Sequence, residues 1–167
     1  MRPAELDSLL REVRRGSVTP ARAARRIREA PLEQLGFAAL DHQRALRNGF
    51  PEVVFGQGKT PEQLVTIVGR LHARHGLVLA TRVDDAGRAA IAAAWPEAEL
   101  HERARCVVVR RRAGPHRARI HARGRVLVLC AGTADLPVAE EALVTARTLG
   151  SRAELIADVG VAGAALI

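Results

Sequence analysis

Short apolar runs of strand length recur along the chain from about residue 52 and alternate with stretches of helical periodicity. Leu77–Ala80, Cys106–Val109 and Val126–Cys130 are such runs, and Leu64, Ile67, Val68 and Leu71 ahead of the first run stand at helical spacing. Strands that alternate with helices in this way favour an α/β fold with a largely parallel sheet. No run approaches the roughly 18–20 residues that a membrane-spanning helix needs, so no membrane segment is expected.

The first part of the chain is predicted to be helical. A helix is expected over residues 4–15, a second over 20–30 behind an N-cap at Thr19, and a third over 32–47. Such short amphipathic helices cannot form a core alone, so they must pack on the remainder of the chain.

Capping signals place two further helices. Thr60 precedes a proline, and Gln63 stands at the third helical position, which is the capping-box pattern. Asp84 is expected to cap a helix that ends near Trp95. With a strand at residues 52–55, the predicted order is strand, helix, strand, helix, strand.

The chain is expected to divide at an arginine-rich stretch. Residues 1–112 form an N-terminal helical and small α/β region, 113–124 a basic connector, and 125–167 the start of a doubly wound parallel-sheet domain. This last part is predicted to be one strand–helix–strand unit with the glycine-rich opening of another helix. A single such unit is not a complete doubly wound domain, so the sequence suggests a C-terminally truncated chain.

The charge balance is strongly basic, with a net charge of +8 and a pI near 11.3. Lys59 is the only lysine among 26 basic residues, and alanine is abundant, which indicates a bias of the whole sequence rather than a demand from a ligand. Aromatic residues make up 2%, too few for the stacking platforms of single-strand binders. Nucleic acid is therefore not an expected partner, although a basic module using Arg103–Arg125 stays a rival hypothesis.

Cysteine and histidine usage points away from disulfides and metals. Cys106 and Cys130 lie in or at the end of apolar runs, where buried reduced thiols are expected, and no secretory signal precedes them. A cytoplasmic protein is therefore expected. His72 and His75 are three residues apart on a predicted helix, but no third ligand is near in sequence, so no metal site is expected.

The loop over residues 131–135 is the strongest generic signal for a binding site. A small-residue turn between a strand and a helix N-terminus offers backbone N–H groups to an anion. Thr133 can add a hydroxyl donor, and Asp135 can accept from ribose hydroxyls or merely cap the helix. Both the phosphate site and the structural turn stay open at this point.

Two other patterns are weaker. Residues 56–60, Gly-Gln-Gly-Lys-Thr, resemble the end of a phosphate-binding P-loop, but Val53 stands where that motif needs glycine, so a nucleotide triphosphatase is rejected. Lys59 remains notable as the only lysine. Asp41 and Arg44 are three residues apart and can form an ordinary surface ion pair.

Four blocks follow one another along the chain: Asp41–Pro61, Ala80–Arg82, Ala131–Ala142 and Asp158–Gly163. Together they resemble the LarB family of nickel-pincer cofactor biosynthesis, which is related to the PurE carboxylases. The third block is similar to the nucleotide-binding loop that LarB shares with PurE.

The resemblance implies an enzyme that carboxylates nicotinic acid adenine dinucleotide on its pyridinium ring and hydrolyses the phosphoanhydride to release AMP. A cysteine thiolate adds to the ring in the family mechanism. Carbon dioxide or bicarbonate is the co-substrate, no tightly bound cofactor is expected, Mg²⁺ is an open option, and the complete protein is expected to be a homo-oligomer. The implied substrate-binding residues are Gly132, Thr133, Asp135, Gly160, Gly163, Lys59, Arg82, Asp41 and Arg44.

Three departures from the family pattern bear on activity. Ala134 stands where the family usually has serine, and residues 164–166 replace a segment that usually contains His-Arg. The family's nucleophilic cysteine lies beyond Ile167, and core packing explains Cys130 adequately. The catalytic residue is therefore unknown, and this chain is expected to be inactive or very weak. The enzymatic alternative is a PurE-type carboxylase acting on aminoimidazole ribonucleotide.

Overall fold

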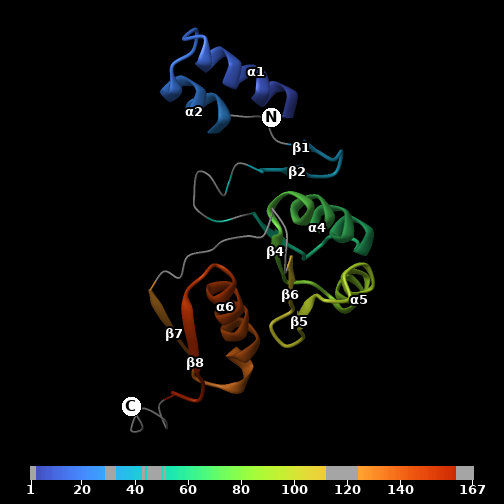
Figure 1. Ribbon diagram of the computed structural model, residues 1–167. Coiled ribbons are helices and arrows are strands. Elements are labelled where there is room, and N and C mark those ends of the chain that lie inside the picture. The colour runs from blue at the N-terminus through green and yellow to red at the C-terminus, as the bar shows by residue number, and fades with distance from the viewer. Residues whose placement is uncertain are drawn as a thin grey trace. The chain divides into compact units, whose positions relative to one another are not determined.

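The computed structural model describes residues 3–28, 33–42, 44, 50, 52–111 and 124–160. Internal contacts group the chain into two compact units, Met1–Glu52 and Val53–Ile167 (Figure 1). Of the expected connector at 113–124, only Gly124 is described. Both of its flanks belong to the second unit, and the domain boundary expected there stays a prediction.

The first unit begins with the two helices that the sequence predicts, α1 (Pro3–Arg14) and α2 (Pro20–Arg28). The backbone N–H of Arg22 donates to the Thr19 hydroxyl at 3.3 Å, which fits the expected N-cap. The two helices share a small apolar cluster made of Leu9, Val18 and Ala23, with Val13 and Ile27 packed against it.

The helix expected over residues 32–47 is wrong for residues 33–40. Two short antiparallel strands lie there, β1 (Glu33–Gln34) and β2 (Ala39–Leu40). Gly36 takes a left-handed φ of 82°, and the Leu35 N–H donates to the Ala38 carbonyl at 2.8 Å, which closes a tight turn. A glycine in this conformation interrupts a helix, and that outweighs the apolar spacing. Residues 43 and 45–49 lie outside the described part.

The second unit contains a four-stranded sheet in the order β3-β4-β6-β5. Its strands are β3 (Val53–Phe55), β4 (Leu77–Thr81), β5 (Glu99–His101) and β6 (Cys106–Arg110), and its helices are α4 (Pro61–His75) and α5 (Asp85–Ala94). β3 and β4 are parallel, as expected, but β6 runs antiparallel to both β4 and β5. The prediction of a largely parallel sheet is therefore wrong here. The cause is β5, a short polar strand that the hydrophobic pattern does not reveal and that pairs with β6 as a hairpin.

The predicted helix caps are confirmed. Thr60 and Gln63 form both hydrogen bonds of the capping box at the start of α4. Asp84 accepts from the Gly87 N–H at 2.8 Å and begins α5. α4 ends at Gly76, whose φ of 68° is the left-handed conformation typical of a helix C-terminus.

The two central strands of the four-stranded sheet, β4 and β6, are buried on both faces. Side chains alternate along a strand, so the β4 residues Leu77 and Leu79 point to one face, where they cluster with Val144. Val78 and Ala80 point to the other face and are equally buried. The α4 residues that are buried are Leu64, Ile67, Val68 and Leu71. Burial on both faces explains why β4 is a continuous apolar run in the sequence.

The last described part is a strand–helix–strand unit, as predicted. Strand β7 (Arg125–Leu129) and strand β8 (Arg152–Ile156) are parallel, and α6 (Leu136–Thr148) connects them (Figure 1). Val144 of α6 belongs to the core of the four-stranded sheet, so α6 packs between the two sheets of the second unit. The expected α/β fold class is confirmed. No helix in the described ranges is long and apolar enough to cross a membrane.

Candidate functional site

The loop after β7 lies at the carboxyl end of the parallel pair and leads directly into α6. Residues Thr133–Asp135 form one turn of 3-10 helix. The Asp135 carboxylate accepts weakly from the Gly132 N–H, at 3.4 Å, and the Asp135 N–H donates to the Gly132 carbonyl at 3.1 Å. Asp135 thus holds the turn together while remaining exposed, so both interpretations of this loop, structural turn and binding site, have a basis in the geometry.

A cavity of about 410 Å³ opens against this loop. Asp135 lines it and, among the residues that the structure describes, is the one charged side chain on its wall, whereas Thr133 is exposed but does not line it. The other lining residues are Val128, Leu129, Cys130, Ala131, Val138, Ala139 and Ala142. A mostly apolar cavity with a single carboxylate at a strand's carboxyl end is a common setting for a sugar or base.

Two of the glycines predicted to contact substrate lie at this edge. Gly132 has open space where a Cβ would be, so its backbone is accessible. A Cβ on Gly160 would come within 3.3 Å of the Ala131 carbonyl oxygen, so the segment after β8 packs closely on the loop. The hydrogen bond from the Val159 N–H to the Cys130 carbonyl, 3.2 Å long, fixes this approach. Gly163 lies outside the described residues.

Lys59 and Arg82 come after the carboxyl ends of the parallel strands β3 and β4, so they lie at one edge of the other sheet. Both charges already have protein partners. The Lys59 ammonium donates to the Phe55 carbonyl at 2.6 Å, and the Arg82 guanidinium pairs with Glu141 at 2.5 Å. The N–H of Gly56 donates to the Thr81 carbonyl at 2.7 Å, which holds the two strand ends together.

Asp41 and Arg44 belong to the first unit, whereas the other described candidate residues belong to the second. The Asp41 N–H donates to the Glu52 carboxylate at 2.7 Å, and the Arg44 N–H donates to the Asp41 carbonyl at 3.2 Å. The structure therefore brings together Gly132, Asp135 and Gly160 at one sheet edge. It places Lys59 and Arg82 at another.

Both cysteines are buried, as expected. Burial raises the pKa of the Cys106 thiol to about 12, with a further contribution from the negative charge of Glu141. Its sulfur donates to the Ala104 carbonyl at 3.3 Å. Cys106 is thus a protonated core residue with no nucleophilic character. Within the described ranges, no three metal-binding side chains come together.

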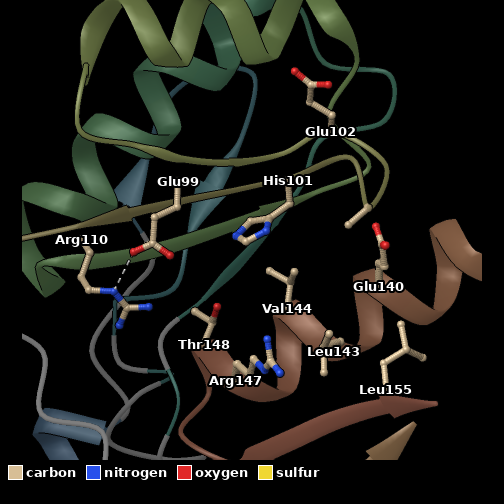
Figure 2. Close-up of a pocket in the computed structure, with 11 residues that line it drawn as sticks. Glu99, His101, Glu102, Arg110, Glu140, Leu143, Val144, Arg147, Thr148 and Leu155 are labelled. Carbon is tan, nitrogen blue, oxygen red and sulfur yellow. Dashed lines mark hydrogen bonds and ion pairs between the residues drawn. The ribbon is translucent and has the colours of Figure 1, made fainter. Parts of the chain in front are cut away.

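The sequence does not reveal a second cavity, which lies between α6 and the β5–β6 hairpin (Figure 2). His101, Arg110, Arg147 and Thr148 are among its lining residues. His101 and Arg110 are far in the sequence from the adjacent Arg147 and Thr148, and none of the four belongs to a motif. Because arginine is abundant throughout the chain, the sequence does not distinguish Arg110 and Arg147, which line the cavity, from the others.

Residues 32–112 match the family model described as the LarB/PurE-like N-terminal domain. The match supports a relationship between this part of the chain and the LarB/PurE family. A curated relative, the uncharacterized protein MJ0165 of Methanocaldococcus jannaschii, is 32% identical over 129 residues, which cover 74% of this chain and 49% of that protein. The chain thus spans about half the length of this relative. The matched residues include β1 to β6 with α4 and α5, and they end before the strand–helix–strand unit that carries the loop cavity.

Proposed function

We propose that the chain is part of a LarB-type synthase that binds nicotinic acid adenine dinucleotide at the carboxyl edge of β7. The cavity against residues 131–135, with Asp135 on its wall, is the observation on which this proposal depends. The match to the LarB/PurE-like N-terminal domain supports it. Asp135 would accept from a ribose hydroxyl, and the open backbone at Gly132 would approach a phosphate.

The proposed reaction has two parts. In the first, a cysteine thiolate forms a C–S bond with the pyridinium ring, and the resulting electron-rich ring attacks carbon dioxide to form a C–C bond. The ring then loses a proton and the C–S bond breaks, which releases the thiolate and restores the aromatic cation. In the second part, water cleaves the phosphoanhydride and AMP leaves. Carbon dioxide or bicarbonate is consumed, and the complete enzyme acts as a homo-oligomer.

We further propose that this chain binds the dinucleotide without turning it over. Its two cysteines are Cys106 and Cys130. Cys106 is fully buried and protonated. Cys130 is 7% exposed and directly follows strand β7, where it lines the cavity. Removing a nucleophile from a group of residues that act as a unit removes most of the rate.

Binding and turnover are tested separately. Calorimetric titration of the full chain with nicotinic acid adenine dinucleotide is expected to show binding that Asp135→Asn weakens about tenfold, a loss of roughly 1.4 kcal/mol. Glu154→Gln on β8 is the matched control because Glu154 is exposed and lines neither cavity. Equal affinities for the two variants would contradict the assignment of Asp135.

For turnover, the chain is incubated with the dinucleotide and bicarbonate, and AMP and the dicarboxylated mononucleotide are assayed. No product above background is expected. If the chain does turn over and Cys130→Ala abolishes the turnover, Cys130 is the nucleophile and the proposal of an inactive chain is overturned. Tighter binding of aminoimidazole ribonucleotide in a competition titration would favour the PurE-type carboxylase instead.

A further inference from the structure

The second cavity, about 430 Å³ in volume, has walls from four elements of the second unit (Figure 2). Glu99 and His101 come from β5 and Arg110 from β6. α6 contributes the opposite wall and β8 adds Leu155. None of its lining residues lines the loop cavity, so this site is independent of the proposed dinucleotide site.

The wall formed by α6 is held in place at several points. Val144 is part of the apolar core of the four-stranded sheet. Glu140 and Glu141, on the preceding turn of α6, pair with Arg103 and Arg82 at 2.7 Å and 2.5 Å. Because both a packed side chain and two ion pairs fix the helix, the cavity is a preformed feature of this unit.

Three polar groups at this cavity have bonding capacity that the protein does not use. Within the described residues, the His101 ring has no hydrogen-bond or ion-pair partner, and neither has the Thr148 hydroxyl, although Thr148 is only 4% exposed. Arg147 donates from Nε to the Ala153 carbonyl at 2.9 Å, which fixes its guanidinium and leaves the terminal nitrogens available. Arg110 contacts Glu99 at a long 3.4 Å.

These groups come from facing walls of the cavity. In the view of Figure 2, Thr148 lies between Arg110 of β6 and Arg147 of α6, and the His101 ring lies above Thr148. Two guanidinium groups and a hydroxyl form a donor set for a planar anion, because a guanidinium fork matches the two oxygens of a carboxylate. The apolar side chains of Leu143, Val144 and Leu155 line the same space.

We propose that this cavity binds a small organic monocarboxylate. Its carboxylate lies between Arg147 and Arg110 with the Thr148 hydroxyl as a third donor, and its apolar body lies against Val144. A dianionic phosphate fits less well, since Glu99, Glu102 and Glu140 also line the cavity and repel additional negative charge.

Benzoate is a suitable probe because its ring and single carboxylate match this description. Titration of the full chain, followed by the NMR signals of the His101 ring, is expected to give saturable shifts with a dissociation constant on the order of 1 mM. Benzamide has the same shape without the charge, and inorganic phosphate has charge without the apolar body. Both are expected to bind about tenfold more weakly than benzoate. Equal binding of the three, or the absence of a saturable shift with benzoate, would overturn the proposal.

Arg147→Met is expected to weaken benzoate binding at least tenfold. Arg152→Met is the matched control, because Arg152 is exposed on β8 and lines neither cavity, and its substitution removes the same charge. Thr148→Val keeps the shape of a buried side chain and removes only the hydroxyl, so it is expected to weaken binding severalfold even if Arg147→Met fails to fold. Unchanged affinity in Thr148→Val together with equal affinities of the two arginine variants would contradict the site.

Discussion

Arg82 and Glu141 form an ion pair, with 2.5 Å between Nε and Oε2, that joins the carboxyl end of β4 to helix α6. The Arg82 side chain is 38% exposed and Glu141 is 19% exposed, so the pair is only partly screened by water. Arg82 also has a left-handed φ of 54°, which costs energy for any residue other than glycine. Substitutions at Arg82 can therefore separate the contribution of the ion pair to stability from the cost of the strained backbone.

Arg82→Ala is expected to lower the free energy of unfolding by about 1 kcal/mol, because the ion pair is lost and the strained backbone remains. Arg82→Gly also loses the pair but relieves strain worth about 1 kcal/mol, so its stability is expected to lie near that of the unsubstituted chain. Urea unfolding of the three proteins measures both effects. An Arg82→Gly variant that is less stable than Arg82→Ala would contradict the inference that the backbone at residue 82 is strained.

Gly87 offers a sharper test of packing. A Cβ at this position would lie 2.5 Å from Leu64 Cδ1 and 2.9 Å from Val83 Cγ1, both in the core. Gly87→Ala is therefore expected to destabilise the fold by about 1–3 kcal/mol. Gly69→Ala is the control, since Gly69 lies within α4 and its Cβ would make ordinary contact with the Trp95 ring at 3.6 Å.

Alanine at Gly69 is expected to stabilise the chain by up to about 1 kcal/mol through its better helix propensity. Thermal or urea unfolding of the two variants checks that Gly87→Ala lowers the stability of the fold and that Gly69→Ala raises it. The packing of α4 against the start of α5 would be refuted by a Gly87→Ala protein as stable as the unsubstituted chain.

The parts of this fold that the sequence predicts are those with local causes. The capping box at Thr60, the N-cap at Asp84 and the helix between β7 and β8 each depend on residues close in sequence. β5 escaped prediction because Glu99, Leu100 and His101 are stabilised by pairing with β6 rather than by their own pattern. Without β5, the direction of β6 is also predicted incorrectly.

The candidate sites divide in the same way. The loop over residues 131–135 is recognisable because a strand, a small-residue turn and a helix succeed one another directly. Arg110 and Arg147 line the same cavity because α6 lies against the β5–β6 hairpin. No sequence spacing encodes such a meeting, so only the three-dimensional structure reveals it.

His72 is expected to make the fold sensitive to acid. Burial lowers the pKa of its imidazole below the usual 6.5, the charge of Arg111 lowers it further, and Glu97 opposes them. Its Nε2 is buried without a hydrogen-bond partner in the described part, and the ring meets Trp95 edge-on at 6.1 Å between centroids. The unfolded chain therefore binds a proton more readily than the folded one.

This difference fixes the sign of the pH dependence. Stability from the neutral His72 is fully present above pH 6.5 and is lost as the pH falls toward the lower pKa of the folded state. His72→Leu is expected to flatten the decline in the free energy of unfolding between about pH 7.5 and 5, measured by urea unfolding at each pH. An unaltered slope would contradict a depressed pKa at His72.

Cys130 provides a reporter for the proposed dinucleotide site, because it lines the loop cavity together with Asp135 and is 7% exposed. Iodoacetamide is expected to modify Cys130 slowly in the folded chain and to leave Cys106 unmodified, since that thiol is fully buried with a pKa of about 12.

Nicotinic acid adenine dinucleotide at ten times its dissociation constant is expected to slow the labelling of Cys130 about tenfold by occupancy alone. Peptide mass spectrometry over time measures the rates, and Asp135→Asn is expected to reduce the protection. Benzoate, which we place in the other cavity, should give none. Bound dinucleotide that leaves the labelling rate unchanged would mean that it does not occupy the cavity beside residues 131–135.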